Sequence, residues 1–549
     1  MRSNSISLPV ASLLFLAACS SGTGPGNLPV DCSTATPTNL PVGEHTIIDA
    51  SSQGCVRLPS AGPGGAEYLY VALATEGKES SSGVSVGYQL AGSGSGTPLA
   101  SVRRPLLRAF QGPTSAEAFH GRLRAMERDL SQRPGRGLLE GVAASTAAQP
   151  APVLGEQRTF NVLKNSTVGG TSASDYVQVT ATNKYVGVHV AIFVDDAAPT
   201  PGYTQADLDK VGGTFDKYLY PIDVTAFGSE SDINGDGVVL VLLTDRVTKL
   251  TSCGGSVVVG YFFARDLTPG LVGSNGAEIF YGLTPDPSCN IPPADAVDFL
   301  PRVFIHEFQH MINYNQHVLV RGGSSEDTWL NEGLSTFAEE LGGRQIPDSV
   351  CTNNDCLTQY TLSDLENGSD YLSDVESHYL VGPSGRPPPI PLAEYGSAWL
   401  FVRWVTEHFG QPPALGTDAT QRLVQTSQVG SDNVAAATGV PFSTLVTQWQ
   451  MANYLDNLPG FTPSDPRLQY LSWDFRQVYD SLNGSYPLAP DSTAGAYSRT
   501  GNLLAGSGRH VLIAQPPVSG EVDFKLTSTD GTTPLPATAK PRIGLVRIH

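Results

Sequence analysis

The chain has 549 residues, of which 40% are hydrophobic and 15% charged, a composition typical of globular proteins and a length that predicts three or four domains. The 52 acidic side chains outnumber the 33 basic ones, for a formal net charge of -19. This balance argues against nucleic acid or an acidic membrane surface as a partner.

The first 18 residues predict a secretory signal peptide. They contain one Arg and a short apolar run that ends in small residues, too short for a membrane-spanning helix. The tetrad Leu16-Ala17-Ala18-Cys19 resembles a bacterial lipobox, which implies cleavage before Cys19 and a lipid anchor on its thiol. A plain signal peptide followed by secretion is the alternative. Both interpretations predict an exported protein, either a lipoprotein of the bacterial cell envelope or a secreted one.

The other six cysteines favour three disulfides, as expected in an oxidising compartment. Several connectivities are compatible with six cysteines, and none can be deduced from sequence. Nearness along the chain favours Cys32 with Cys55, Cys253 with Cys289, and Cys351 with Cys356.

Two segments precede the longest part of the chain. Residues 30–100 read as short strands separated by Gly, Ser and Pro, which predicts a small module resembling a β-sandwich over 19–100. Residues 101–156 are rich in Arg and contain a helical pattern over 116–130. This second segment could clamp onto the main domain as a propeptide-like latency segment, or it could be a solvated linker helix, which we prefer.

From residue 157 the strands lengthen, and a helix follows with Thr204 as its N-cap. Next, Asp232, Asn234 and Asp236 alternate ahead of a Gly, as oxygen ligands do in the first half of a calcium loop. The closing Glu of such a loop is missing, because Leu243 holds its position. The alternatives are therefore a Ca²⁺ site and a tight polar turn.

The sequence HEFQH predicts a metal site on a helix. His306 and His310 stand four residues apart within an apolar run of helical spacing, so their imidazoles project from one face about 6 Å apart along the axis. One Zn²⁺ ion is within reach of both. Glu307 lies beside them and is placed to accept a proton from water at the metal.

Catalytic zinc requires three protein ligands, and two His with one Glu is a known set. Glu332 lies in a second helical segment, WLNEGLSTFAEE, and is our candidate for the third ligand. His317 is the alternative, but it would need a sharp turn after the first helix, where Asn313 replaces the expected Gly. We expect His317 instead to be a cation at a helix C-terminus.

HEFQHMIN followed by WLNEGLS resembles the hyicolysin-type neutral zinc metallopeptidases of bacteria, within the gluzincin group, and WLNEG is also similar to the aminopeptidase branch. The resemblance implies that Glu332 is a zinc ligand and that Glu339, two turns later, holds a zinc-bound imidazole. It also implies a Tyr that stabilises the oxyanion at a helix start about sixty residues further on, for which Tyr395 is the candidate. Tyr371 and Tyr379 lie in the same interval.

The same resemblance concerns substrate recognition. The strand over residues 274–283 has the place of the edge strand on which gluzincins lay their substrate. The aminopeptidase branch carries Gly-x-Met-Glu-Asn there to grip a free amine, whereas this chain has Gly276-Ala277-Glu278-Ile279. We therefore expect an endopeptidase, with an aminopeptidase-like exopeptidase as one alternative.

The predicted fold is α+β and multidomain. A gluzincin-type metallopeptidase core over residues 157–460, with an antiparallel or mixed sheet and a helical lobe, would be flanked by small β modules at 19–100 and 461–549. The predicted function is that of a zinc endopeptidase acting on proteins or peptides, attached to membrane only through its lipid. A second hypothesis is a surface lipoprotein that binds a partner and keeps a non-catalytic metalloprotease lobe as scaffold.

Overall fold

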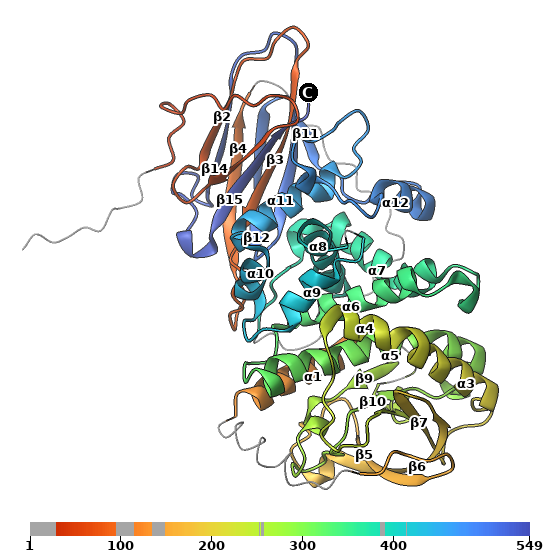
Figure 1. Ribbon diagram of the computed structural model, residues 1–549. Helices are drawn as coiled ribbons and strands as arrows, with labels where there is room; N and C mark the ends of the chain where they lie inside the picture. The colour runs from red at the N-terminus through yellow and green to blue at the C-terminus, as the bar shows by residue number, and fades with distance from the viewer. Residues whose placement is uncertain are drawn as a thin grey trace, which may run out of the picture.

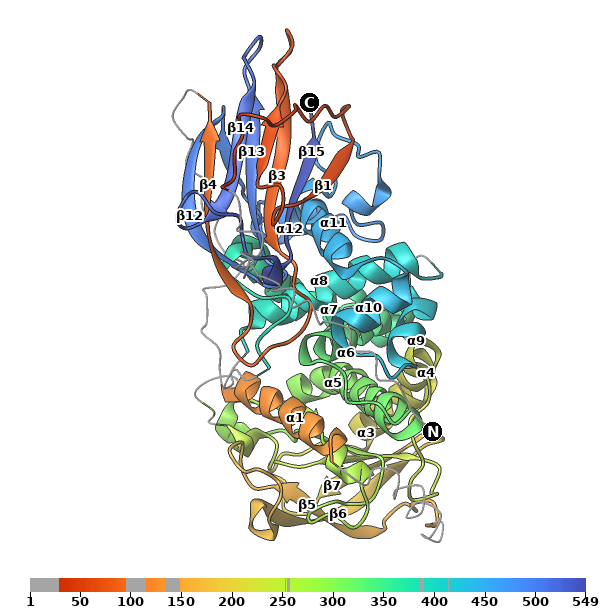
Figure 2. The same ribbon diagram turned by 90° about the vertical axis from the view of Figure 1, so that its left-hand side faces the viewer.

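The computed structural model describes residues 29–94, 115–133, 149–251, 253, 257–384, 390–412 and 414–549. The predicted signal peptide and Cys19 lie outside these ranges. Figures 1 and 2 show three regions stacked along the long axis, namely a mixed sheet with its covering helices, a central group of helices and a β-sandwich. In the part of the chain that is described, no helix is both long and apolar enough to cross a membrane.

The mixed sheet has six strands in the order β5-β6-β7-β8-β10-β9, and neighbours are antiparallel except for the two parallel pairs β7/β8 and β8/β10. Alternate residues of its central strands face opposite sides, so that Ile192 packs toward the helices and Phe193 toward the other face. The strands are β5 (Gln157–Leu163), β6 (Tyr176–Val186), β7 (Val190–Asp195), β8 (Val239–Leu243), β9 (Gly260–Phe262) and β10 (Ile279–Gly282).

Helices lie along one side of this sheet, and further helices form the central region. Thr204 caps α3 as the sequence predicted, because its hydroxyl accepts the Asp207 N–H at 3.2 Å. The helices are α1 (Ser115–Ser131), α3 (Gln205–Thr214), α4 (Tyr220–Phe227), α5 (Pro293–Tyr314), α6 (Thr328–Gln345), α7 (Cys356–Ser373), α8 (Leu392–Phe409), α9 (Thr417–Val424), α10 (Gly430–Thr438), α11 (Phe442–Leu455) and α12 (Phe475–Asn483).

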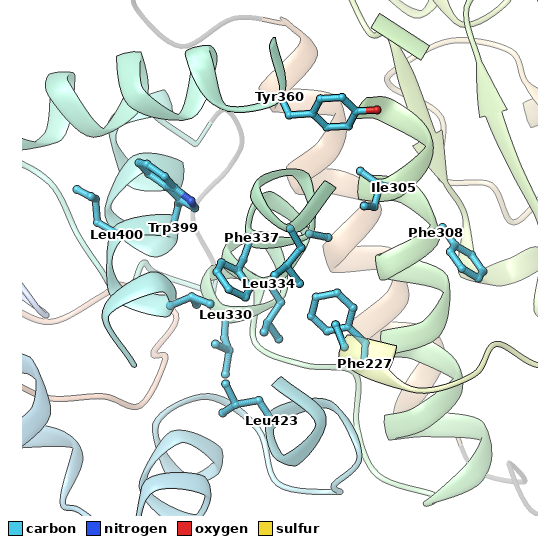
Figure 3. Packing of buried hydrophobic residues seen from close by; sticks show 14 of the residues in the cluster. Phe227, Ile305, Phe308, Leu330, Leu334, Phe337, Tyr360, Trp399, Leu400 and Leu423 are labelled. Carbon is cyan, nitrogen blue, oxygen red and sulfur yellow. The ribbon is translucent and has the colours of Figure 1, made fainter. Parts of the chain in front are cut away.

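Helix α6 is the centre of the helical region. Figure 3 shows Leu330, Leu334 and Phe337 of α6 surrounded by apolar side chains from α4, α5, α7, α8 and α9. The helix is buried on nearly every side, and it approaches α8 closely because a Cβ on Gly333 would stand only 3.0 Å from the Ala398 carbonyl oxygen. This close packing fixes the position of α6 and of the polar side chains that it carries, among them Glu332 and Glu339.

The β-sandwich combines strands from two distant parts of the chain. One sheet has the order β1-β15-β3-β13-β11 and the other β12-β4-β14-β2, so among the named strands no two of β1 to β4 pair with each other. The strands are β1 (His45–Asp49), β2 (Cys55–Leu58), β3 (Ala66–Ala74), β4 (Ser85–Ser93), β11 (Asp491–Thr493), β12 (Ala496–Leu504), β13 (Gly508–Gln515), β14 (Val522–Ser528) and β15 (Pro541–Arg547).

This sandwich corrects the prediction of two separate β modules at 19–100 and 461–549. Both segments contain strands as expected, but apart from the neighbours β13 and β11 the strands of one segment alternate with those of the other in two shared sheets. Tyr70 of β3 and Leu90 of β4 pack with Phe524 and Ile543 in one core. Pairing across more than 400 residues leaves no signal in the local pattern, which reports only that a segment is a strand.

The six cysteines pair as nearness in sequence had favoured. The disulfides are Cys32–Cys55, Cys253–Cys289 and Cys351–Cys356, with Cα–Cα distances of 5.5, 4.8 and 5.2 Å.

Candidate active site

Helix α5 presents both predicted histidines on one face. Pro293 stands at its first turn, where a missing N–H costs nothing, and its apolar residues pack against the sheet and α6. His306 and His310 fall one turn apart on this packed helix, and their Nε2 atoms are 3.1 Å from each other. Burial, together with the nearby Arg124, lowers the pKa of His310 to about 3, so its imidazole is neutral and keeps a lone pair for a metal.

Glu332 of α6 completes the cluster. Its Oε2 atom lies 3.7 Å from His306 Nε2 and 3.6 Å from His310 Nε2. A tetrahedral zinc ion with ligands at about 2.0–2.1 Å needs donor atoms about 3.3–3.4 Å apart, and the three observed separations bracket this value. Among the described residues, His306, His310 and Glu332 form the one group of three such side chains that could hold an ion.

Further side chains orient the two imidazoles. His306 Nδ1 donates to Glu339 Oε1 at 2.7 Å, and Arg302 lies 3.3 Å from the other oxygen of Glu339. His310 Nδ1 lies 3.0 Å from Asn331 Oδ1 and 2.9 Å from Ser335 Oγ. With the proton of each ring on Nδ1, each Nε2 is the nitrogen that faces the cluster. Burial lowers the pKa of His306, but Glu332 and Glu339 outweigh it and raise this pKa well above its ordinary value, so a metal must displace a proton from His306 Nε2. Glu339 thus lies where the family resemblance placed it, while Asn331 and Ser335 had not been anticipated.

Glu307 lies next to the cluster and against the edge of the sheet. Its Oε2 accepts the backbone N–H of Phe262 in β9 at 2.7 Å. The residue is 3% exposed, and burial raises the pKa of its carboxyl, although His306 and Arg124 act in the opposite direction. A cleft is lined by His306, Glu307 and Glu332, so this carboxylate borders it together with two of the three clustered side chains.

The edge strand beside this site is β9 and not the predicted strand over 274–283. β10 (Ile279–Gly282) lies inside the sheet between β8 and β9, and β9 has only three residues, too few to give a recognisable pattern. Glu278 points away from the site, because its carboxylate accepts from Ser231 Oγ (2.5 Å) and the Ile233 N–H (2.9 Å).

Tyr395 lies in the first turn of α8, at a helix start as predicted, and lines the same cleft as His306 and Glu307. Its hydroxyl is buried and has no hydrogen-bond partner among the described residues. Burial, followed by the nearby Glu332, raises the pKa of Tyr395 well above its ordinary value, so the phenol stays protonated. A buried O–H donor that lacks an acceptor in the cleft can serve a substrate oxygen.

His317 lies apart from the cluster, in a π-helical turn (Asn315–Val320) after α5. The expectation of a cation at a helix C-terminus is wrong, because the side chain is fully buried and burial lowers its pKa to about 4. Its neighbour Glu326, at 3.7 Å, has a pKa raised to about 8 by burial. Both groups are therefore neutral near pH 7.

The loop with Asp232, Asn234 and Asp236 uses its oxygens within the turn. Asn234 donates to Asp236 Oδ2 at 2.9 Å, and Asp232 and Asp236 accept backbone N–H groups of the same turn. The structure does not support a Ca²⁺ site here, and the alternative of a tight polar turn accounts for these side chains.

Helix α1 corrects the preference for a solvated linker. Within residues 115–131, Phe119, Leu123 and Arg124 are at most 2% exposed, and Arg124 Nε lies 3.7 Å from Glu332 Oε1. The sequence signal was the apolar spacing of Phe119 and Leu123, which marks a buried face, but nothing in the sequence indicated which surface covers it.

No protein-family model matches the chain. The neutral metalloprotease ShpI of Staphylococcus hyicus is 28% identical to it over 184 residues. The match covers 33% of this chain and 40% of ShpI, so the chain spans less than half of that relative.

Two solved structures are also similar in part. An M1 zinc metallopeptidase from Deinococcus radiodurans is 14% identical and has a TM-score of 0.25, with coverage of 53% of this chain and 48% of that one. A variant of a two-domain M1 zinc metallopeptidase bound to L-tryptophan is 15% identical, with a TM-score of 0.25 and coverage of 54% and 48%. Scores of this size do not establish a common fold.

Proposed function

We propose that this protein is a zinc-dependent endopeptidase, exported and anchored to the cell envelope through Cys19 or secreted. The observation that carries the proposal is the convergence of His306 Nε2, His310 Nε2 and Glu332 Oε2 within 3.1–3.7 Å of one another, beside a buried carboxylate, Glu307. The partial similarity to a neutral metalloprotease agrees with it. Three disulfides agree with export.

The residues divide the work of peptide hydrolysis. His306, His310 and Glu332 hold the ion, which when bound polarises a peptide carbonyl and acidifies a water ligand. Glu307 accepts the proton of the attacking water and passes it to the leaving amine. Tyr395 donates a hydrogen bond to the carbonyl oxygen as negative charge develops on it.

Endopeptidase action is favoured over aminopeptidase action by the surroundings of the cleft. Glu278, the acidic residue in the segment where the aminopeptidase branch grips a free amine, faces the turn at Ser231 and Ile233 instead. β9 is the edge strand of the mixed sheet, and a peptide recognised by addition to an edge strand does not need a chain end. The presence of Glu307 speaks against the hypothesis of a non-catalytic scaffold, because its loss would be the simplest way to end the chemistry.

Metal removal tests the proposal. We expect the purified protein to contain one zinc per chain and to hydrolyse casein, and we expect 1,10-phenanthroline to abolish hydrolysis as the ion is lost. Adding zinc after removal of the chelator should restore the rate. Metal content measured by atomic absorption, beside the casein assay, gives both readouts. Hydrolysis that continues in metal-free protein would contradict the proposal.

Tyr395→Phe is expected to lower kcat for casein by about 100-fold while zinc content stays the same, since one donor to the oxyanion is lost. Tyr371→Phe is a matched control, because the Tyr371 hydroxyl is also buried but accepts from Gln450 (2.7 Å), away from the cleft. Its kcat should equal that of the wild type. Equal rates for both variants would exclude Tyr395 from the reaction.

A further inference from the structure

Helix α1 forms one wall of the cleft that holds the metal ligands. Figure 2 shows this helix, in orange, between the mixed sheet below and the central helices above. Glu117 and His120 of α1 line the cleft together with His306 and Glu307. One turn further on, α1 lines an adjoining cavity that it shares with Glu332 and Tyr395.

Arg124 joins α1 directly to a metal ligand. Its side chain is 2% exposed, with Nε 3.7 Å from Glu332 Oε1 and Nη2 3.2 Å from Glu127 Oε1. The two oxygens of Glu332 therefore face different groups: Oε2 faces the imidazoles of His306 and His310, and Oε1 faces the guanidinium of Arg124. Arg124 leaves the metal-facing oxygen in place, so α1 can cover the site while an ion is bound. Buried opposite charges at this separation attract strongly.

The same helix covers the edge strand beside the metal. An edge strand presents N–H and C=O groups to which an extended peptide can add. Arg124 Nη2 donates to the Phe262 carbonyl of β9 at 3.5 Å, and Glu127 accepts a hydrogen bond from the backbone of Ala264. The Phe119 ring stands edge-on to Tyr261 of β9, with centroids 5.2 Å apart. A peptide laid along β9 would compete with α1 for the Phe262 carbonyl and for the space that Phe119 and Arg124 fill beside the strand.

A second arginine ties α1 to the other regions. Arg128 Nη2 lies 2.9 Å from Glu79 Oε2, in the loop between β3 and β4, and donates to Thr328 Oγ1 of α6 at 3.0 Å. Ser131 Oγ lies 3.4 Å from Ser325 Oγ just before α6. The helix is thus anchored at successive turns from the edge strand to the start of α6.

We propose that α1 is a built-in inhibitor of the peptidase, which occupies the path of the substrate along β9 and must leave before a peptide can reach Glu307. This inference rests on the proposed peptidase function and concerns how that activity is regulated. Release of α1 does not require loss of the segment before it, because β3 pairs with β13 and β15, and β4 with β12 and β14. Residues 29–94 would remain part of the active form.

The double variant Phe119→Ser with Arg124→Glu tests the proposal in the full chain. Phe119→Ser removes the phenyl ring that packs against Tyr261, and Arg124→Glu places a carboxylate beside Glu127 and Glu332. We expect trypsin to cut after Arg122 and Arg128 at least about tenfold faster than in the wild type, chelators to extract zinc faster by a similar factor, and casein turnover to rise at least about tenfold. Arg133→Glu, an exposed site just beyond α1, makes the same charge change and should alter none of the three.

Two results of this experiment would overturn the proposal. One is faster tryptic cutting of α1 in a variant that still unfolds cooperatively on heating, when the wild type hydrolyses casein and the variant does so at the same or a lower rate. α1 would then not inhibit the site. The other is an α1 that stays protected from trypsin, because the contacts named above would then not be what holds it.

A reversible lock gives an independent test if the double variant does not fold. Ser131→Cys with Ser325→Cys places two thiols where the hydroxyls are 3.4 Å apart. The bridged protein should hydrolyse casein at no more than about a tenth of the rate of the same protein without the bridge. Equal rates in the two states would overturn the proposal.

These measurements distinguish failure of the inhibitor proposal from failure of the peptidase proposal. Zinc extraction and tryptic cutting report whether α1 covers the site without any hydrolysis being measured. If both change as expected while neither wild type nor variant hydrolyses casein, the peptidase proposal fails and the cover stands. If the wild type hydrolyses casein in a zinc-dependent way and release of α1 adds nothing, only the inhibitor proposal fails.

Discussion

Glu307→Gln is expected to abolish casein hydrolysis, with a loss of about 10²–10⁴-fold in kcat, while zinc remains bound. The amide has the shape of the carboxyl and can still accept the Phe262 N–H that Glu307 accepts at 2.7 Å, so the fold around β9 is preserved. It cannot accept a proton from the attacking water. The loss should therefore fall on kcat and leave KM and metal content close to their wild-type values.

The measurement compares zinc content and initial rates of casein cleavage for the wild type and the variant. Both should be repeated in the background in which α1 is displaced, where the wild-type rate is expected to be higher. Glu521→Gln, a surface change in the β-sandwich, is the control for loss of one negative charge. Retained hydrolysis in Glu307→Gln with full zinc content would remove Glu307 from the role of base.

Glu332→Ala is expected to remove both zinc and activity. The substitution deletes one of three converging donors and leaves His306 and His310 alone, and two imidazoles do not complete the set that catalytic zinc requires. The loss of zinc affinity should exceed the roughly 10–100-fold that is typical when a partner outside the ligand set is replaced. Zinc per chain after dialysis, measured over a range of free zinc concentrations, gives the affinity directly.

His317→Gln is the matched comparison for Glu332→Ala, because His317 was the competing third ligand from the sequence. The structure places it in the turn after α5, beside Glu326 and outside the cluster, so zinc affinity should not change. Loss of zinc in His317→Gln together with full zinc in Glu332→Ala would mean that the ligand set is different from the one described.

The cluster of His306, His310 and Glu332 could be predicted because its signals are local. Two histidines at helical spacing must share a face, and Glu332 stood in the next helical segment, so covalent order and helix period were enough to bring these groups together as candidates. The contacts of Asn331 and Ser335 with His310 could not be predicted, because the sequence does not show which side chain a polar residue on a buried helix will contact. The position of Arg124 depends on how α1 packs across the sheet edge, which no periodicity reveals.

The two parts of the β structure also differ in how far the sequence predicts them. The mixed sheet joins strands that follow one another closely, and its strand and helix types could be expected from the pattern. The β-sandwich joins β3 to β13 and β15 across most of the chain, so the pattern located the strands and could not identify their partners. β9, with three residues, was too short to be seen, although it is the strand that contacts Glu307.

The interleaved sandwich also sets the order of events during biosynthesis. Strands β1 to β4 emerge first, yet β3 must wait for β13 and β15, and β4 for β12 and β14, until more than 400 further residues have been made. Non-local pairing of this kind is slow, and unpaired strand edges are prone to aggregation meanwhile. We therefore expect nascent chains that stop short of β12 to depend on chaperones, whereas the completed protein should not.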